Sequence, residues 1–345
     1  MKLVYIGAFP PGYGGVTIKN KNLFDALSDK TELLKVDLNK VKKRDVKETF
    51  KLITAFLSRK NRFLIGVSGK KTRRRFTQLL YYVNRTAMNH SLIFLMGGTV
   101  ANDIASDPGY LKYASEYKMI YAETQGMVNT LRNAGLKNVG LYPNGRFRPK
   151  NTPPKRKRGD TLKCVFFSAV RPEKGVDIIL EAAKSLPGIY FAFYGPIEHE
   201  YQLVFTQKVN ELTNVSYHGV FKGEPEDVYL ELSKYDILLF PTMWKAEGVP
   251  GILVEGKIAG LAEVVSNHNY NSELVEDHIE GIVLTQNVAN NMVKVLRQLE
   301  DDNELLLKLK IGSTKSAEKY YIDNYTEDIL NTILDRDKYK MELRL

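Results

Sequence analysis

The sequence predicts an α/β protein with two Rossmann-like domains, each a parallel sheet covered by helices, that face a central cleft. Its 345 residues are about twice the length of one ordinary domain. Short apolar runs alternate with segments of helical periodicity, which is typical of parallel sheets. A proline-rich stretch interrupts this alternation, and the same architecture then starts again. Two such domains form a cleft, and a cleft is the default position of a ligand.

The first domain is expected at residues 1–145. Its first strand, at 3–9, is followed by a loop of glycine and proline and by a helix at 16–28. The other strands are expected at 33–38, 91–96, 119–122 and 138–142, with helices in the stretches between them. One of these helices, at 125–134, precedes Gly135, and glycine commonly ends a helix.

A linker is expected at residues 146–161, because prolines and a basic run leave no periodic apolar face there. The second domain is expected at residues 162–324. Its predicted strands are 162–170, 189–194, 215–218, 237–240, 263–266 and 281–284, and its predicted helices are 176–186, 201–212, 227–235, 252–259 and 288–299. We expect the last helix, at 325–345, to pack back onto the first domain.

The composition excludes several classes of protein. A hydrophobic content of 43% with 10% aromatic residues is too high for a disordered or collagen-like chain. The single cysteine, Cys164, excludes a disulfide framework, and its apolar neighbours predict a buried thiol. The start lacks the apolar core of a signal peptide, and apolar runs are far shorter than the roughly 18 residues of a membrane span. We therefore expect a cytoplasmic protein, in solution or peripherally at the inner face of the cytoplasmic membrane.

The net charge of +10 conceals an asymmetry. Residues 1–158 contain 31 Lys and Arg against 10 Asp and Glu, whereas residues 159–345 contain 19 against 30. Residues 40–85 alone hold 15 basic and 2 acidic side chains. Such polarity indicates an anionic partner, with nucleic acid, acidic phospholipid and a phosphorylated substrate as candidates. A solvated basic face is the alternative.

Two loops have the composition of anion sites. Gly14 and Gly15 lie between the first strand and the first helix, where glycine lets backbone N–H groups approach an anion. This loop is neither a dinucleotide fingerprint nor a Walker A motif, and a structural turn is the alternative. In the second domain Arg171 and Lys174 follow a strand and precede a helix, which suits a diphosphate. An exposed turn that needs Gly175 is the alternative there.

The most specific pattern is a pair of glutamates, Glu247 and Glu255, around a junction of loop and helix. Pro250 and Gly251 suit the first turn of a helix, whose free N–H groups can hold a phosphate or a sugar oxygen. Glu247 would point into the cleft, and Glu255 would grip a pair of vicinal hydroxyls. The spacing alone arises by chance, but its position after a strand of the second domain strengthens the interpretation.

Together these motifs resemble the retaining, nucleotide-sugar-dependent glycosyltransferases of GT-B fold, the family-four group that includes many bacterial polysaccharide and lipid-glycan enzymes. The resemblance covers nearly the whole chain in order. The matching segments are the Gly14-Gly15 loop, Tyr142-Pro143-Asn144-Gly145, Pro172-Glu173-Lys174-Gly175-Val176-Asp177, the Glu247 to Glu255 motif, Ala259-Gly260-Leu261, and the stretch from Ser266 to Val275.

The resemblance implies roles for these residues. Lys174 would pair with the donor diphosphate, Glu247 would act as the catalytic residue at the donor sugar, and Glu255 would hold the ribose. The N–H groups of Gly251 and Ile252 would face the sugar and phosphate. The family uses no bound metal or other cofactor, and a UDP-sugar is its commonest donor. The acceptor would be a glycan or a lipid-linked hydroxyl bound by the first domain, with Gly97, Gly98 and Asn144 as candidates.

Some positions depart from the family pattern. Ala169 stands where an arginine is usual, so Arg171 would have to replace it, and Gly97 and Gly98 stand where many members carry a histidine. These departures leave a non-catalytic relative that binds glycan or anionic lipid as an alternative. A nucleic-acid-binding protein is a weaker alternative, because the basic segment lacks aromatic residues spaced as a stacking platform. We expect no nucleic-acid partner.

The basic segment also contains apolar residues at helical spacing, namely Phe50, Ile53 and Leu57. A helix of this kind could lie on an anionic membrane with its cations toward the headgroups. Arg73, Arg74 and Arg75 are expected to face the same membrane. The alternative is that the apolar face packs on the sheet and only the charges are exposed.

Overall fold

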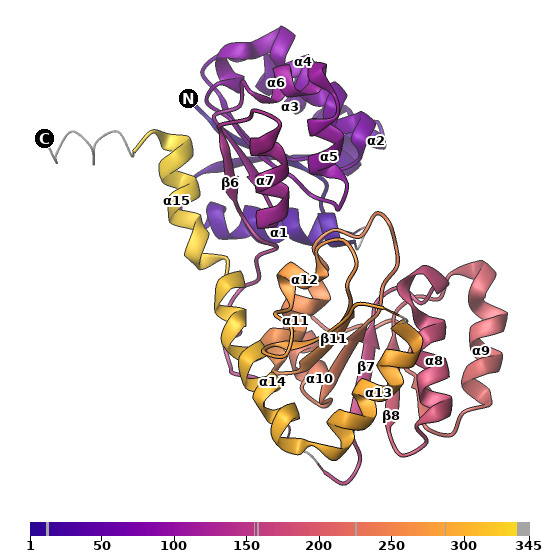
Figure 1. The fold of residues 1–345 in the computed structure, drawn as a ribbon. Coiled ribbons are helices and arrows are strands. Elements are labelled where there is room, and N and C mark those ends of the chain that lie inside the picture. Colours follow the sequence, from indigo (N-terminus) through magenta and orange to yellow (C-terminus); the bar gives the residue numbers. More distant parts are fainter. Residues whose placement is uncertain (12–13, 155, 157–158, 225, 287, 337–345) are drawn as a thin grey trace, which may run out of the picture. The chain divides into compact units, whose positions relative to one another are not determined.

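The computed structural model describes residues 1–11, 14–154, 156, 159–224, 226–286 and 288–336. These residues form two compact units (Figure 1). The first unit comprises Met1–Phe147 and the segment from Tyr321 onward, and the second unit is Arg148–Tyr320. The chain therefore returns to the first unit after Tyr320. The part of the predicted helix from residue 337 to 345 lies outside the described residues.

The first unit is a six-stranded parallel sheet of order β2-β1-β3-β4-β5-β6. The strands are β1 (Leu3–Gly7), β2 (Leu33–Asp37), β3 (Arg62–Gly66), β4 (Leu92–Phe94), β5 (Met119–Ala122) and β6 (Val139–Leu141). Leu3 in β1 aligns with Leu33 on one side and with Arg62 on the other. The helices are α1 (Gly15–Ser28), α2 (Leu38–Lys42), α3 (Val46–Leu57), α4 (Lys70–Met88), α5 (Val100–Ala105), α6 (Pro108–Ala114), α7 (Gln125–Asn133) and α15 (Asp323–Leu334).

Strand β3 was not expected, because its residues lie in a stretch that the sequence predicts to be helical. Phe63, Leu64 and Ile65 are fully buried and pair with β1 and β4. A short apolar run with cations on both sides has no decisive periodicity, so only its place between two strands identifies it as a strand.

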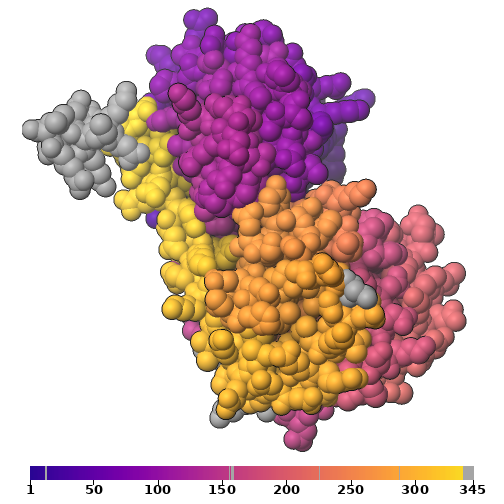
Figure 2. All heavy atoms as spheres, viewed as in Figure 1, coloured from indigo at the N-terminus to yellow at the C-terminus, as the bar shows by residue number. Residues whose placement is uncertain are grey.

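Helix α15 completes the core of the first unit. Ile329 and Ile333 pack with Leu23 and Leu27 of α1 and with Phe94 of β4. Figure 2 shows this yellow helix lying against the purple surface of the unit. Burial of several apolar side chains at this contact supplies the main driving force that holds the helix in place.

The second unit repeats the architecture with the strand order β12-β11-β10-β7-β8-β9. Its strands are β7 (Lys163–Phe167), β8 (Tyr190–Tyr194), β9 (Val215–Tyr217), β10 (Ile237–Phe240), β11 (Ala262–Ser266) and β12 (Gly281–Leu284). Its helices are η1 (Pro172–Lys174), α8 (Val176–Ser185), η2 (His199–Tyr201), α9 (Gln202–Asn210), α10 (Asp227–Leu232), α11 (Gly251–Ala259), α12 (Asn271–Leu274), α13 (Val288–Asp301), α14 (Asn303–Ser316) and η3 (Ala317–Tyr320). Cys164 lies in its core, and burial raises the pKa of the thiol.

Candidate functional site

The sheet of the second unit has a point at which its strand order reverses. From β7 the chain adds β8 and β9 on one side, and then β10, β11 and β12 on the other. At such a point the loops after the two central strands diverge and leave a crevice at the carboxyl edge of the sheet. The loop after β7 carries Arg171 and Lys174, and the loop after β10 carries Glu247.

Backbone contacts hold these two loops together. The N–H of Met243 donates a hydrogen bond of 2.8 Å to the carbonyl of Glu173. Gly175 has φ 76°, and a Cβ at this residue would lie 2.2 Å from the carbonyl oxygen of Pro241. Glycine is therefore required at position 175 for both its conformation and its close approach to the other loop.

Lys174 and Glu247 form an ion pair between these two loops. Their residues are only 5% and 8% exposed, respectively. Thr242 donates a hydrogen bond of 3.2 Å from its hydroxyl to the Glu247 carboxylate. The Lys174 ammonium also lies 4.5 Å from the ring centre of Trp244. Burial lowers the pKa of Lys174, and the Glu247 carboxylate opposes this shift. The site thus holds an ammonium and a carboxylate. A ligand with an anionic group could take the place of Glu247 beside Lys174, and a ligand with a hydrogen-bond donor could take the place of Lys174 beside Glu247.

Arg171 contacts the ring of Trp244, as Lys174 does. Its guanidinium is 5.5 Å from the ring centre of Trp244. It also binds Glu173 at 3.0 Å and Glu198 at 2.9 Å. The hydrogen bond to Glu173 raises the pKa of Arg171. The structure therefore brings the two predicted cations together, although Arg171 has carboxylate partners of its own.

The N-terminus of α11 lies next along the chain. Pro250 precedes the helix, and Gly251 and Ile252 are its first residues. The first N–H groups of a helix lack partners within it and carry a partial positive charge. Glu255 is half-buried and follows Gly251 by one helical turn, so the two residues share a face.

A third loop, after β11, braces the Glu247 loop, and the sequence analysis did not assign it this role. The Asn269 side chain donates a hydrogen bond of 2.9 Å to the carbonyl of Glu247. Ser266 donates from its hydroxyl to the carbonyl of Thr242 at 2.5 Å. Ser266 is the last residue of β11 and Asn269 follows it, and β11 neighbours β10 at the same sheet edge, which is the signal that could have identified both residues.

A buried charge cluster lies behind α11. The ammonium of Lys257 contacts the carboxylates of Glu263 at 3.0 Å and Glu280 at 2.8 Å. Burial raises the pKa of Glu263 to about 7. Burial also acts on Glu280, but Lys257 outweighs it and the pKa of Glu280 is lowered. Among the residues that the structure describes, no three His, Cys, Asp or Glu side chains gather in a way that could hold a metal ion.

In the first unit, Gly14 and Gly15 face open space. A Cβ at either position would have no atom of the described residues within 4 Å. Gly14 has φ −168°, an extended conformation that any residue adopts. Its N–H donates a hydrogen bond to the Thr17 hydroxyl at 3.1 Å. No contact with the described part of this unit therefore requires glycine at these positions, which is the pattern expected where a ligand approaches the backbone.

Asn20 attaches α1 to the sheet. Its side-chain amide donates hydrogen bonds to the carbonyls of Ala8 at 3.0 Å and Gly66 at 2.9 Å, and its oxygen accepts one from the Tyr5 hydroxyl at 2.9 Å. A Cβ on Gly66 would lie 1.8 Å from that oxygen, so the glycine makes room for the amide. This fixes the start of α1 and the loop before it.

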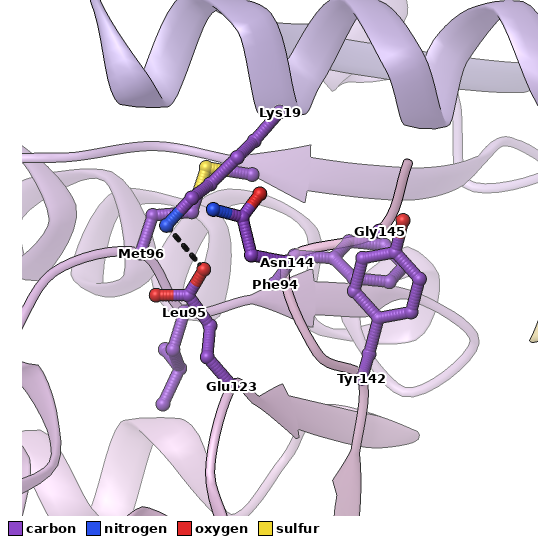
Figure 3. A pocket seen from close by; sticks show the side chains of 8 residues that line it. All are labelled: Lys19, Phe94, Leu95, Met96, Glu123, Tyr142, Asn144 and Gly145. Atoms are coloured by element: carbon purple, nitrogen blue, oxygen red, sulfur yellow. Dashed lines mark hydrogen bonds and ion pairs between the residues drawn. The ribbon is translucent and has the colours of Figure 1, made fainter. Parts of the chain in front are cut away.

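A small pocket at the carboxyl edge of the first sheet contains a second buried ion pair, Lys19 with Glu123 (Figure 3). The other carboxylate oxygen of Glu123 accepts a hydrogen bond of 3.4 Å from the N–H of Gly97. Asn144 lines the pocket, and its side-chain oxygen accepts a hydrogen bond of 2.7 Å from Arg146. The volume of the pocket is about 10 Å³, enough for about one water molecule. The ion pair therefore shapes the edge on which Gly97, Gly98 and Asn144 lie, and the pocket itself is too small for a sugar.

The prediction that three consecutive arginines face a membrane is wrong for Arg73. This residue is 2% exposed, donates a hydrogen bond of 3.0 Å to the Tyr110 hydroxyl and pairs with Asp103. Arg74 binds Asp107 at 2.6 Å, and Arg75 is exposed. Because three consecutive residues of a helix point to different sides of it, the three arginines do not share one face. None of the described helices combines the length and the apolar content that a membrane crossing requires.

Comparison with known proteins agrees with this geometry. Residues 147–316, just under half of the chain, match the family model described as glycosyl transferases group 1. The matched segment corresponds to the second unit. A curated relative is the amylovoran biosynthesis glycosyltransferase AmsK of Erwinia amylovora, 23% identical over 185 residues. That match covers 51% of this chain and 45% of AmsK, so this chain matches less than half of its relative.

Solved structures show the fold of the whole chain. Anabaena HepE in complex with UDP has a TM-score of 0.71 and 14% identity, over 97% of this chain and all of HepE. WaaG, a glycosyltransferase involved in lipopolysaccharide biosynthesis, has a TM-score of 0.62 and 15% identity, over 96% of this chain and 99% of WaaG. The two parallel-sheet units thus have the GT-B fold, as the sequence predicts.

Proposed function

We propose that this protein is a retaining glycosyltransferase. It moves a sugar from a nucleotide sugar, with a UDP-sugar favoured, to a hydroxyl of a glycan or lipid-linked acceptor. The reaction serves the synthesis of a cell-surface polysaccharide or glycoconjugate on the cytoplasmic side of the membrane. The nucleotide sugar is a co-substrate, and no bound metal or other cofactor takes part.

The observation that carries this proposal is the buried pair of Lys174 and Glu247 at the reversal point of the second sheet. A diphosphate in this crevice would take the Lys174 ammonium as a charged hydrogen-bond donor. The N-terminus of α11, at Gly251 and Ile252, would add its partial positive charge. Glu255 would hold the ribose hydroxyls. Because cations of the protein neutralise the diphosphate, the charge of a metal ion is not needed there.

Glu247 becomes available for catalysis when Lys174 leaves it for the diphosphate. Once the diphosphate holds the ammonium, the Glu247 carboxylate is free to bind the donor sugar as positive charge develops on it. The bond from the anomeric carbon to the phosphate oxygen breaks as the acceptor oxygen bonds to that carbon on the same face. The acceptor proton passes to the departing diphosphate oxygen. The protein contributes orientation and charge stabilisation to this step.

The first unit would bind the acceptor. Gly14 and Gly15 leave its backbone open to an anionic group. Gly97, Gly98 and Asn144 lie at the carboxyl edge of its sheet, where Lys19 and Glu123 shape the surface. The relatives support a glycan acceptor: AmsK takes part in amylovoran biosynthesis, and WaaG in lipopolysaccharide biosynthesis.

The proposal is tested by thermal-shift screening of the purified protein against a panel of nucleotide sugars. A ligand at 100 times its Kd stabilises the folded state by about 2.7 kcal/mol. The donor found in this way is then incubated with simple sugars and lipid-linked glycans in the presence of EDTA, and the anomeric configuration of the product is determined by NMR. An inverted product would refute retention, and loss of transfer in EDTA would refute metal independence. Donor binding with neither transfer nor hydrolysis would favour a non-catalytic relative.

A further inference from the structure

Helix α3 carries an apolar stripe that faces solvent. Val46, Phe50, Ile53 and Leu57 are 79%, 67%, 52% and 67% exposed. Their spacing of four, three and four residues places them in one line along the helix. The opposite side of α3, with Ala55 and the Glu48 side chain, is buried against the unit. The sequence alternative that this apolar face packs on the sheet is therefore wrong for these residues.

Cations border the stripe. Lys43 and Lys47 lie at one end of α3, and Arg59 and Lys60 follow the other end. All four are exposed, and among the described residues none has an ion pair. The nearby acids are already engaged, because Asp45 caps α3 and Glu48 binds Lys51 at 2.9 Å. The surface thus presents free positive charge beside exposed hydrocarbon.

Helix α4 extends this surface. Its Asn84 side chain donates hydrogen bonds to the carbonyls of Phe56 at 2.7 Å and Ser58 at 3.0 Å, which fixes α4 against the end of α3. On α4, Leu79 and Val83 are 53% and 47% exposed. A shallow groove of about 320 Å³ on α4 is lined by Lys71, Thr72, Arg75, Phe76 and Leu79. It combines two exposed cations with an apolar floor, which is the chemistry of an anionic headgroup with its first acyl carbons.

We propose that α3 and the adjoining face of α4 dock this protein on an anionic phospholipid bilayer. The apolar stripe enters the boundary between headgroups and acyl chains, and the bordering cations contact lipid phosphates. A second copy of the chain is a poor occupant, because each face carries the exposed cations Lys43, Lys47, Arg59 and Lys60, and two such faces would repel one another. Docking does not depend on the proposed sugar transfer, since the surface shares no residue with the crevice of the second unit.

The test is co-sedimentation of the full chain with vesicles of phosphatidylcholine alone or of phosphatidylcholine mixed with phosphatidylglycerol. We expect binding to the mixed vesicles only, with release at high salt. The stripe variant Phe50→Ser/Ile53→Ser/Leu57→Ser and the charge variant Lys47→Gln/Arg59→Gln/Lys60→Gln should each bind at least about tenfold more weakly. Matched controls change exposed residues of the second unit, namely Leu203→Ser/Leu307→Ser/Ile311→Ser and Lys222→Gln/Lys294→Gln/Lys308→Gln, and should bind like the wild type.

Every other outcome overturns the proposal. Equal binding to both kinds of vesicle, or none at low salt, would exclude an anionic bilayer as the occupant. If the stripe variant bound as well as the wild type, electrostatic adsorption alone would account for the interaction, and the apolar stripe would not enter the bilayer. Self-association in sedimentation velocity that the stripe variant abolishes, without vesicle binding, would assign the face to a second copy, and binding of RNA in place of vesicles would assign it to nucleic acid. Because all substituted side chains are exposed, the variants should keep the wild-type circular dichroism and melting temperature.

Discussion

Lys174 and Glu247 form a buried ion pair although 73 residues separate them in the sequence. The pair connects the loops after β7 and β10, and so it joins the two halves of the second sheet at their reversal point. A buried charge that loses its partner typically costs about 3–5 kcal/mol. The pair that would bind the donor therefore also stabilises the fold. Variants of the pair must distinguish its contribution to stability from its contribution to donor binding.

Replacement of Lys174 by methionine should weaken UDP binding by about 10- to 150-fold, because a charged hydrogen bond of about 1.5–3 kcal/mol is lost. Trp244, the single tryptophan of the chain, lies 4.5 Å from the Lys174 ammonium, so its fluorescence can report the titration. Lys208→Met is the control, because Lys208 pairs with Asp177 in a partly exposed contact of the same unit. UDP affinity that is unchanged in Lys174→Met would contradict the assignment of the diphosphate site.

The double variant Lys174→Met/Glu247→Gln separates stability from function. It removes both charges, so it should recover most of the melting temperature that Lys174→Met loses through an unpaired Glu247. It should not recover UDP binding or transfer. Recovery of both would mean that the pair acts only as a structural contact.

Glu247→Gln should lower turnover by at least about tenfold, which corresponds to about 1.4 kcal/mol of transition-state stabilisation. The amide keeps the shape of the side chain and can still accept the Thr242 hydrogen bond, so the fold should persist. The loss should fall on kcat, and UDP affinity should not decrease, because the diphosphate contact belongs to Lys174 and the amide competes less than the carboxylate for its ammonium. Initial rates at saturating donor give this comparison, and wild-type turnover would exclude a catalytic role.

Both sheets could be predicted largely from the sequence, because buried parallel strands are short apolar runs between helical segments. The strands at 119–122, 237–240 and 281–284 agree with the structure to the residue. The exception is β3, whose short run has no decisive period.

The candidate site could be predicted only where a local motif marks it. Lys174 and Glu247 lie in such motifs, but their contact does not follow from either motif alone. Asn269, which braces the Glu247 loop, and the pair of Lys19 and Glu123 were not found. Lys19 and Glu123 lie 104 residues apart, and only the strand order brings them to one sheet edge. Such pairs need the topology before they can be inferred.

Gly14→Ala and Gly15→Ala should leave the melting temperature unchanged or slightly raised. The added methyl group meets no atom of the residues that the structure describes within 4 Å, and the smaller number of unfolded conformations favours the folded state by up to about 1 kcal/mol. Donor affinity should nevertheless fall, since the methyl group would occupy the space of the phosphates. Gly175→Ala is the contrasting variant and should be destabilised, because its Cβ would lie 2.2 Å from the Pro241 carbonyl. Full activity of both the Gly14 and the Gly15 variant would exclude a ligand at this loop.

The buried cluster behind α11 predicts how stability depends on pH. Burial raises the pKa of Glu263 to about 7, above its ordinary value of 4.5. Between these values the folded state binds more protons than the unfolded state, so the contribution of Glu263 to stability decreases as the pH rises through this range. Glu263→Gln removes this dependence. The variant should gain stability relative to the wild type between about pH 4.5 and 7, by up to a few kcal/mol, with no further gain above that range.

Glu280→Gln is the matched control for this prediction, because the ammonium of Lys257 lowers the pKa of Glu280 against the effect of burial. The stability from Glu280 is present above its ordinary pKa and is lost as the pH falls through the lowered value. This variant should therefore be less stable than the wild type at neutral pH and should approach it in acid. Urea unfolding followed by Trp244 fluorescence reports the second unit specifically, since that unit contains the one tryptophan. If the unfolding free energies of Glu263→Gln and the wild type ran parallel from pH 5 to 8, Glu263 would have to be ionised throughout, and the pKa assignment for the cluster would be wrong.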